Sequence, residues 1–169
     1  MKINFSILKK IIYFLFIIIL DRYSKYLAIM NNDFLIFDYI AFINLIPFIN
    51  YGFSFGIFSL KYEVLKFISF GIIFILLLII LLSAFLRFRV NGSIFYEIII
   101  LICACSNLID RIIYGGVIDF ICINTEIFPW IIVLNFADIF ISIFSILLFL
   151  DWIKNSEIYI FENFYGKNN

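Results

Sequence analysis

Two short stretches pair an asparagine with an aspartate inside apolar sequence, and these residues are the best candidates for chemistry. Asn107 precedes Asp110 by three positions, and Asn135 precedes Asp138 by the same spacing. Residues at i and i+3 share one face of a helix, so each amide can point with its carboxylate into one cavity. An isolated charge at the centre of a membrane-spanning helix costs about 2.5 to 3.5 kcal/mol, so a polar pair placed there twice calls for a reason.

The chemistry that these residue types favour is hydrolysis by a pair of carboxylates. Two carboxylates a few ångströms apart in a low-dielectric site hold one proton between them over a wide pH range. The ionised member can take a proton from water while the protonated member stabilises charge on a scissile carbonyl, with no metal or cofactor. Histidine is absent from the chain, which excludes Ser/His and Cys/His catalysis and the commonest metal ligand.

The same spacing allows three other interpretations. Asn135 and Asp138 could be a helix N-cap followed by an acid in the first turn. Asp110 and Arg111 could form an ion pair at a helix end. Membrane carboxylates also serve as proton or ion relays, so a small transporter or channel subunit is the alternative function, and a purely structural membrane subunit is the third.

The composition identifies an integral membrane protein. Of 169 residues, 66% are hydrophobic and 14% charged, against about 45 to 50% and 25% in soluble domains. The net charge is zero, and no basic run extends beyond Lys9-Lys10, which argues against a nucleic-acid partner. Three cysteines without a C-x-x-C pair are interpreted as small buried apolar residues: Cys103, Cys105 and Cys122.

We predict an all-α membrane protein with four transmembrane helices and a small β-rich extracytoplasmic cradle, in a single domain. The predicted spans are about residues 10–29, 67–86, 94–111 and 133–151. In the first span, Asp21 and Lys25 stand at i and i+4, an order and spacing that favour an ion pair. The cradle is expected to comprise about residues 31–66, where Pro, Gly and Asn interrupt the apolar sequence, and the loop 112–130.

Four spans put both termini on one side of the membrane. That side carries seven basic residues against five on the other, so the positive-inside rule favours cytoplasmic termini. The third span then ends at Asp110 where the fourth carries Asp138 near its start, and both carboxylates are expected at the outer leaflet, with Asp21 and Lys25 at the same depth.

The ordered motifs resemble lipoprotein signal peptidases, the type II signal peptidases of bacteria, over nearly the whole length. Asp21-Arg22-Tyr23-Ser24-Lys25 is similar to the family's D-x-x-T-K box, with Ser24 keeping the hydroxyl. The other similar boxes are Asn50 to Gly56 (N-x-G-x-x-F-G), Asn107 to Arg111 (N-x-x-D-R), Gly116 to Phe120 (a glycine-containing V-x-D-F box) and Asn135 to Asp138 (N-x-A-D). Five boxes in order make the resemblance specific.

The resemblance implies a membrane aspartyl endopeptidase with Asp110 and Asp138 as the catalytic pair. It implies supporting or substrate-binding roles for eight further residues: Asn107, Asn135, Asp21, Lys25, Asn50, Gly52, Arg111 and Asp119. The implied substrate is a diacylglyceryl-modified prolipoprotein, cut on the amino side of its lipidated Cys at the outer face of the bacterial cytoplasmic membrane. Membrane lipid is the only other expected partner, and the chain is expected to be a monomer.

The chain departs from the family pattern at a few positions. Cys103-Ala104-Cys105-Ser106 stands where the family usually has a G-A-x-G pattern. Small residues are kept there, so close helix packing beneath Asp110 remains possible. Leu134 and Ile139 replace a common Phe and a common Ser on either side of the last box.

Overall fold

The computed structural model describes residues 5–30, 43–51, 63–123 and 132–164, which form four helices and three strands. The helices are α1 (Phe5–Met30), α2 (Glu63–Arg89), α3 (Phe95–Tyr114) and α4 (Phe136–Phe164). The strands are β1 (Ile43–Asn50), β2 (Val117–Ile123) and β3 (Ile132–Leu134). The protein is therefore mostly helical with one small sheet, and the expected β-rich layer is present in part, as β1.

Two of these helices are long and apolar enough to cross a membrane, Phe70–Arg89 of α2 and Phe136–Asn155 of α4. Each has 20 residues, which at 1.5 Å per residue matches a hydrocarbon core of about 30 Å. No residue of this stretch of α2 is buried inside the protein, which is typical of a helix that faces lipid. Four charged residues of α1 and α3 are buried within the protein: Asp21, Lys25, Glu97 and Asp110.

The sheet is antiparallel, with β2 in the centre between β1 and β3. Asn50 pairs with Val117 and Phe48 with Asp119, and the register then shifts before Leu45, around Pro47, which cannot donate a ladder hydrogen bond. A Cβ on Gly116 would lie 2.8 Å from the carbonyl oxygen of Asn50, so only glycine permits this close pairing of the strands.

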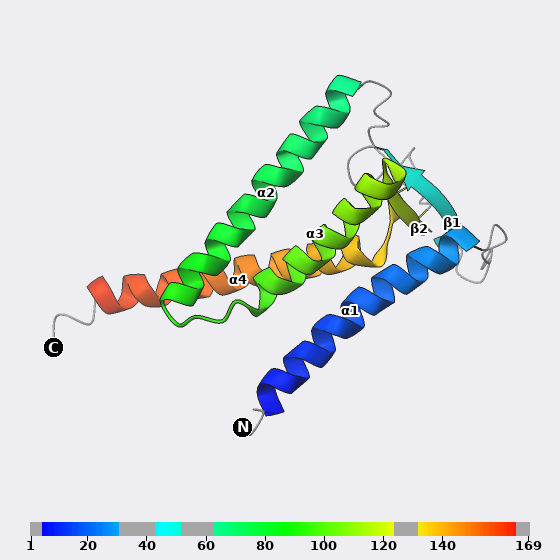
Figure 1. Cartoon of the computed structure of the whole chain (residues 1–169). Helices are drawn as coiled ribbons and strands as arrows, with labels where there is room; N and C mark the ends of the chain where they lie inside the picture. Colours follow the sequence, from blue (N-terminus) through cyan, green and yellow to red (C-terminus); the bar gives the residue numbers. More distant parts are fainter. Residues whose placement is uncertain (1–4, 31–42, 52–62, 124–131, 165–169) are drawn as a thin grey trace.

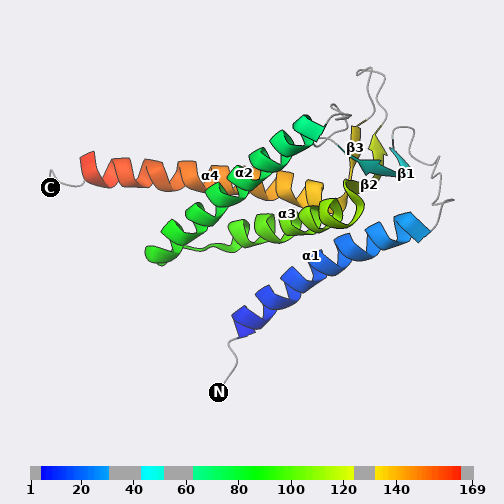
Figure 2. The ribbon, with the colours of Figure 1, turned by 45° about the horizontal axis from the view of Figure 1, so that its top comes forward.

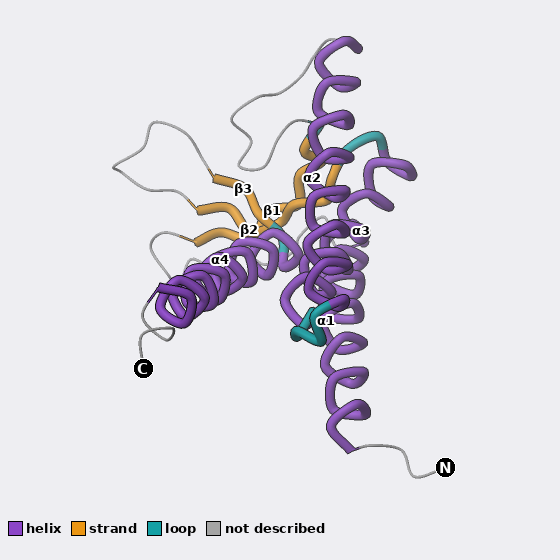
Figure 3. The backbone as a smooth tube through the Cα atoms, turned by 90° about the vertical axis from the view of Figure 1, so that its left-hand side faces the viewer, coloured by secondary structure: helices purple, strands orange, loops and turns teal. Residues whose placement is uncertain are grey.

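One end of the helix bundle meets the sheet. Figures 1 and 2 show that the last turns of α1 and α3 and the first turn of α4 converge there. A small apolar cluster of Ala28, Ile118 and Phe120 joins α1 to β2 at this end. A larger cluster around Ile17, Ile99 and Phe144 joins α1, α3 and α4 further along the bundle. Figure 3 shows α4 running at an angle to the other three helices.

Some predicted boundaries differ from the structure. The fourth span was expected from about residue 133, but β3 occupies Ile132–Leu134 and α4 begins at Phe136. The expected loop 112–130 contains the central strand β2. Cys103 and Cys122 are buried as expected, whereas Cys105 is exposed on α3. Gly52 lies outside the described residues.

Candidate active site

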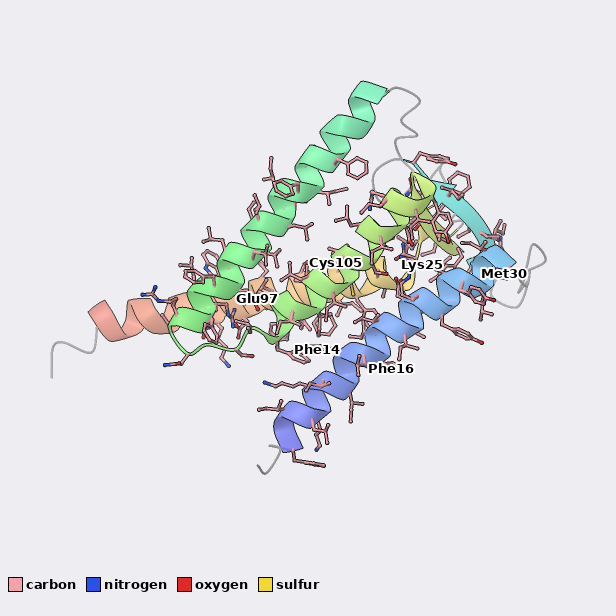
Figure 4. All side chains as sticks on the ribbon, viewed as in Figure 1. Phe14, Phe16, Lys25, Met30, Glu97 and Cys105 are labelled. Atoms are coloured by element: carbon pink, nitrogen blue, oxygen red, sulfur yellow. The ribbon has the colours of Figure 1, made fainter. Side chains whose placement is uncertain are left out.

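Lys25 is the centre of a buried polar network where α1 meets α3. Its side chain is fully buried, and its Nζ lies 2.9 Å from Oδ2 of Asp21 and 2.8 Å from Oδ2 of Asp110. The same ammonium donates a hydrogen bond of 2.6 Å to Oδ1 of Asn107. A buried cation needs such partners to offset the cost of leaving water. The predicted pair of Asp21 and Lys25 is thus present, and Figure 4 labels Lys25 at the sheet end of the bundle.

Asp21 holds the start of α4 in addition to its ion pair with Lys25. Its Oδ1 accepts a hydrogen bond of 2.9 Å from the backbone N–H of Ala137, and its Oδ2 accepts one of 2.6 Å from Ser106 Oγ. The free N–H groups of a helix start favour a negative charge. Asp21 therefore ties α1 to both α3 and the first turn of α4.

Asp110 is fully buried between two cations. Arg22 donates from its guanidinium to Oδ1 of Asp110, and Lys25 holds Oδ2. The guanidinium also donates to the backbone oxygen of Ser106 at 3.3 Å. Arg111, the sequence neighbour of Asp110, donates instead to the backbone oxygen of Asn107 at 3.2 Å. The carboxylate of Asp110 is thus committed to ion pairs with α1.

Asp138 is held at the first turn of α4 by the two asparagines of the sequence motifs. Asn135 Oδ1 accepts from the N–H of Asp138 at 2.9 Å, and the N–H of Asn135 donates to Oδ2 of Asp138 at 3.4 Å, which is the reciprocal pattern of a capping box. Asn107 Nδ2 donates to Oδ1 of Asp138 at 2.8 Å. The N-cap interpretation is therefore correct for the local geometry, and Asp138 remains only partly buried.

Asp119 lies on β2 and shares a hydrogen-bond partner, Asn135, with Asp138. Asn135 Nδ2 donates to Oδ1 of Asp119 at 2.7 Å, and Asn50 Nδ2 donates to Oδ2 at 2.9 Å. Burial raises the pKa of Asp119 to about 7, and repulsion from Asp138 adds to the rise. Asn135 thus bridges two carboxylates, one of which is protonated in part at neutral pH.

A cavity of about 340 Å³ opens beside Asp138, between α2, α3 and α4. Asn107, Arg111 and Asp138 form its polar part. The remainder is lined mostly by apolar side chains of α2 and α3, with Ile141, Ser142 and Ser145 contributed by α4. Of the three carboxylates Asp110, Asp119 and Asp138, it is Asp138 that lines the cavity. An apolar cavity with a few convergent polar groups is the usual form of a ligand site.

The structure brings together nine of the ten residues singled out in the sequence. Eight form one hydrogen-bonded and ion-paired network: Asp21, Lys25, Asn50, Asn107, Asp110, Asp119, Asn135 and Asp138. Arg111 adjoins it through Asn107, and Gly52 is the residue outside the described ranges. Sequence reasoning gave no role to Arg22 or Ser106, since both meet partners more than 80 positions away. The signal in the sequence that could have indicated Arg22 is its position directly after Asp21, the acid of the first box.

Comparisons with known proteins agree with this arrangement. Residues 13–154 match the family described as signal peptidase (SPase) II. The chain is 34% identical over 137 residues to a lipoprotein signal peptidase of Thermodesulfovibrio yellowstonii, covering 79% of this chain and 86% of that protein. It is 30% identical over 145 residues to a lipoprotein signal peptidase of Rickettsia africae, covering 84% and 71%.

Two solved structures, each described as a bacterial membrane enzyme, have the same fold. The first has a TM-score of 0.64 at 26% identity and covers 88% of this chain and 89% of its own. The second has a TM-score of 0.59 at 28% identity and covers 86% and 93%. With the apolar surfaces of α2 and α4, these likenesses identify a bacterial membrane protein. The chain belongs to the lipoprotein signal peptidase family, the type II signal peptidases.

Proposed function

We propose that this protein is an aspartyl endopeptidase that removes signal peptides from diacylglyceryl-modified prolipoproteins by cutting on the amino side of the lipidated Cys. The observation that carries the proposal is the pair of carboxylates that Asn135 joins, Asp119 and Asp138, with Asp138 lining an apolar cavity. The substrate class follows from the family to which the chain belongs. The same membership favours hydrolysis over the proton-relay alternative.

We assign the catalytic pair to Asp119 and Asp138, which replaces the expected partner Asp110 by Asp119. Asp110 is ion-paired with Arg22 through Oδ1 and with Lys25 through Oδ2, so both of its oxygens are held by cations of α1. The carboxylate of Asp119 accepts hydrogen bonds from the amides of Asn50 and Asn135, and its pKa is raised by burial and by Asp138. A carboxyl group that keeps its proton near neutral pH can act as a general acid.

Asp138 is suited to the role of base. It lines the cavity, and both of its oxygens accept hydrogen bonds, from Asn107 and from the backbone of Asn135. Asn107 in turn accepts from the ammonium of Lys25, so its amide oxygen is held toward the cation and its amino group toward Asp138. Both oxygens of Asp138 are thus held as hydrogen-bond acceptors, as the role of a general base requires.

The reaction then follows the scheme of two carboxylates sharing a proton. Asp138 takes a proton from water as the water oxygen attacks the scissile carbonyl carbon. Asp119 donates a hydrogen bond to the carbonyl oxygen and stabilises its developing charge. When the C–N bond breaks, the amino nitrogen of the lipidated Cys takes the proton from Asp138, and the signal peptide leaves with a new carboxylate. The scheme requires no metal or cofactor.

The cavity between α2, α3 and α4 is suited to binding an apolar substrate. Its α2 side consists of isoleucine and leucine residues, so a hydrophobic segment can pack there while its peptide bond reaches Asp138. The acyl chains can stay in lipid. In this proposal the site lies at the outer face of the cytoplasmic membrane, with both termini inside and the protein acting as a monomer.

Cleavage of a defined prolipoprotein by the purified protein tests the proposal. A diacylated prolipoprotein in mixed detergent and lipid micelles should be converted to a shorter lipoprotein whose new N-terminus is the lipidated Cys. The same precursor without its diacylglyceryl group is the matched control and should be cut far more slowly. Cleavage at another bond, or equal cleavage of the two precursors, would contradict the proposed specificity.

A further inference from the structure

A second cavity lies at the end of the bundle opposite the sheet. Its volume is about 510 Å³, and α1, α2, α3 and α4 all contribute to its lining. Lys9 and Lys10 come from α1, Arg87 from α2 and Asp151 from α4. Figure 4 labels Glu97 at this end and Lys25 at the other, so the cavity is far from the candidate active site. Nothing in the proposed reaction uses these residues.

The three cations of this cavity differ in how they are paired. Arg87 is fully engaged, since it holds Glu97 through Nε and Asp151 through its terminal nitrogen, and it donates to the backbone oxygen of Ser93 at 3.0 Å. Lys9 lies over the ring of Phe5, with Nζ 4.6 Å from the ring centre, which leaves its charge unneutralised.

Lys10 completes an unneutralised pair. Among the residues that the structure describes, neither Lys9 nor Lys10 has an ion-pair partner, and both are exposed. The one carboxylate in the lining, that of Asp151, is already bound by Arg87 and by Asn155. The cavity therefore presents two adjacent positive charges to an incoming anion.

The cavity also lies at the depth of a lipid head group. The apolar stretch Phe70–Arg89 ends beside it, so Arg87 stands where a span of this length reaches the membrane surface. On α4, Trp152 is 63% exposed and stacks on Phe149 with a centroid separation of 6.3 Å. Exposed tryptophan is typical of the membrane–water boundary.

We propose that this cavity binds the phosphate of an anionic membrane phospholipid, whose acyl chains lie along the exposed apolar surface of the helices. Lys9 and Lys10 hold the phosphate, and Tyr13 and Ser93, which also line the cavity, offer hydroxyl groups to the head group. The apolar side chains next to the cavity, such as Phe88 at 67% exposure, give the acyl chains a surface that a free phosphate ion would not use.

The test is lipid binding by the full chain and by two matched double variants. Lys9→Gln with Lys10→Gln removes the proposed ligands. Arg89→Gln with Lys154→Gln removes two exposed cations from the same end of the bundle that do not line the cavity. Native mass spectrometry of protein released from detergent, titrated with phosphatidylglycerol or with phosphatidylcholine, measures the apparent Kd for each lipid.

We expect the unmodified protein to retain one phosphatidylglycerol in preference to phosphatidylcholine. Each lysine that holds the phosphate should contribute about fivefold to binding, so the cavity variant should bind phosphatidylglycerol about 25-fold more weakly. The control variant should change the affinity by less than about threefold. Equal losses in the two variants, or no preference for the anionic lipid, would overturn the site. Displacement of the lipid by millimolar inorganic phosphate would overturn its assignment to a phospholipid.

Discussion

Replacing Lys25 by methionine is the perturbation that most directly probes the buried network. The ammonium of Lys25 neutralises Asp21 and Asp110 and holds Asn107, all within 2.9 Å, and its side chain is fully buried. Methionine fills a similar volume without a charge. The Lys25→Met variant would therefore leave Asp21 without any cation and Asp110 with Arg22 alone.

The expected cost follows from that geometry. Removing one partner of a buried ion pair destabilises a protein by about 3 to 5 kcal/mol, because the remaining charge is buried without compensation. For a chain of this length, about 1 kcal/mol corresponds to roughly 2 to 4 °C in Tm, so the midpoint should fall by about 6 to 20 °C. Adding Asp21→Asn to Lys25→Met removes the stranded carboxylate and should recover part of the loss.

Thiol reactivity during heating provides the assay. Cys103 and Cys122 are buried, so a thiol-reactive fluorophore labels them as the protein unfolds in detergent, while the exposed Cys105 gives a constant background. Lys154→Met removes an exposed lysine and is the control, with an expected change in Tm of less than about 2 °C. If Lys25→Met unfolded at the midpoint of the unmodified protein, the network could not be holding α1 to α3 as described.

Three further predictions concern the strands. Gly116→Ala should lower both Tm and cleavage, because the new Cβ would meet the carbonyl oxygen of Asn50 at 2.8 Å and separate β1 from β2; unchanged Tm would contradict the close pairing. The pKa of Asp119 is raised to about 7 in the folded protein, so the folded state holds this proton more tightly than the unfolded state does. The resulting contribution to stability is roughly 4 kcal/mol. It is fully present below about pH 4 and is lost as the pH rises to about 7. Thermal unfolding at pH 4 to 8 should therefore show a loss in the unmodified protein, relative to Asp119→Asn, that grows with pH across that window, and parallel curves would contradict a raised pKa. Cleavage should likewise decline above about pH 7, where Asp119 loses its proton.

Local patterns were sufficient to predict the helices and one ion pair. Long apolar runs predicted α2 and α4 because a helix of that length facing lipid must be apolar throughout. The i, i+4 spacing predicted the pair of Asp21 and Lys25, which the structure contains. The spacing of Asn135 and Asp138 allowed an N-cap as one interpretation, and the structure contains that contact.

The partners of the central residues could not be predicted in this way, because they depend on long-range packing. Asp119 meets Asn50, 69 positions away, only because β2 pairs with β1. Arg22 meets Asp110, 88 positions away, because α1 packs against α3. The sequence therefore indicated two helical carboxylates as a pair, whereas the contacts favour one carboxylate from a strand and one from a helix. Residue spacing along the chain carries no information on such meetings.

The central claim is that Asp119 and Asp138 carry out the cleavage and that Asp110 supports the fold. The most direct measurement compares cleavage of a diacylated prolipoprotein by Asp119→Asn, Asp138→Asn and Asp110→Asn, each normalised to the fraction folded. We predict that the first two lose about 10²- to 10⁴-fold in rate, as expected for loss of a general acid or base, while folded Asp110→Asn stays within about tenfold of the unmodified protein. Full activity in folded Asp119→Asn, with activity lost in folded Asp110→Asn, would contradict the assignment and restore Asp110 as the partner of Asp138.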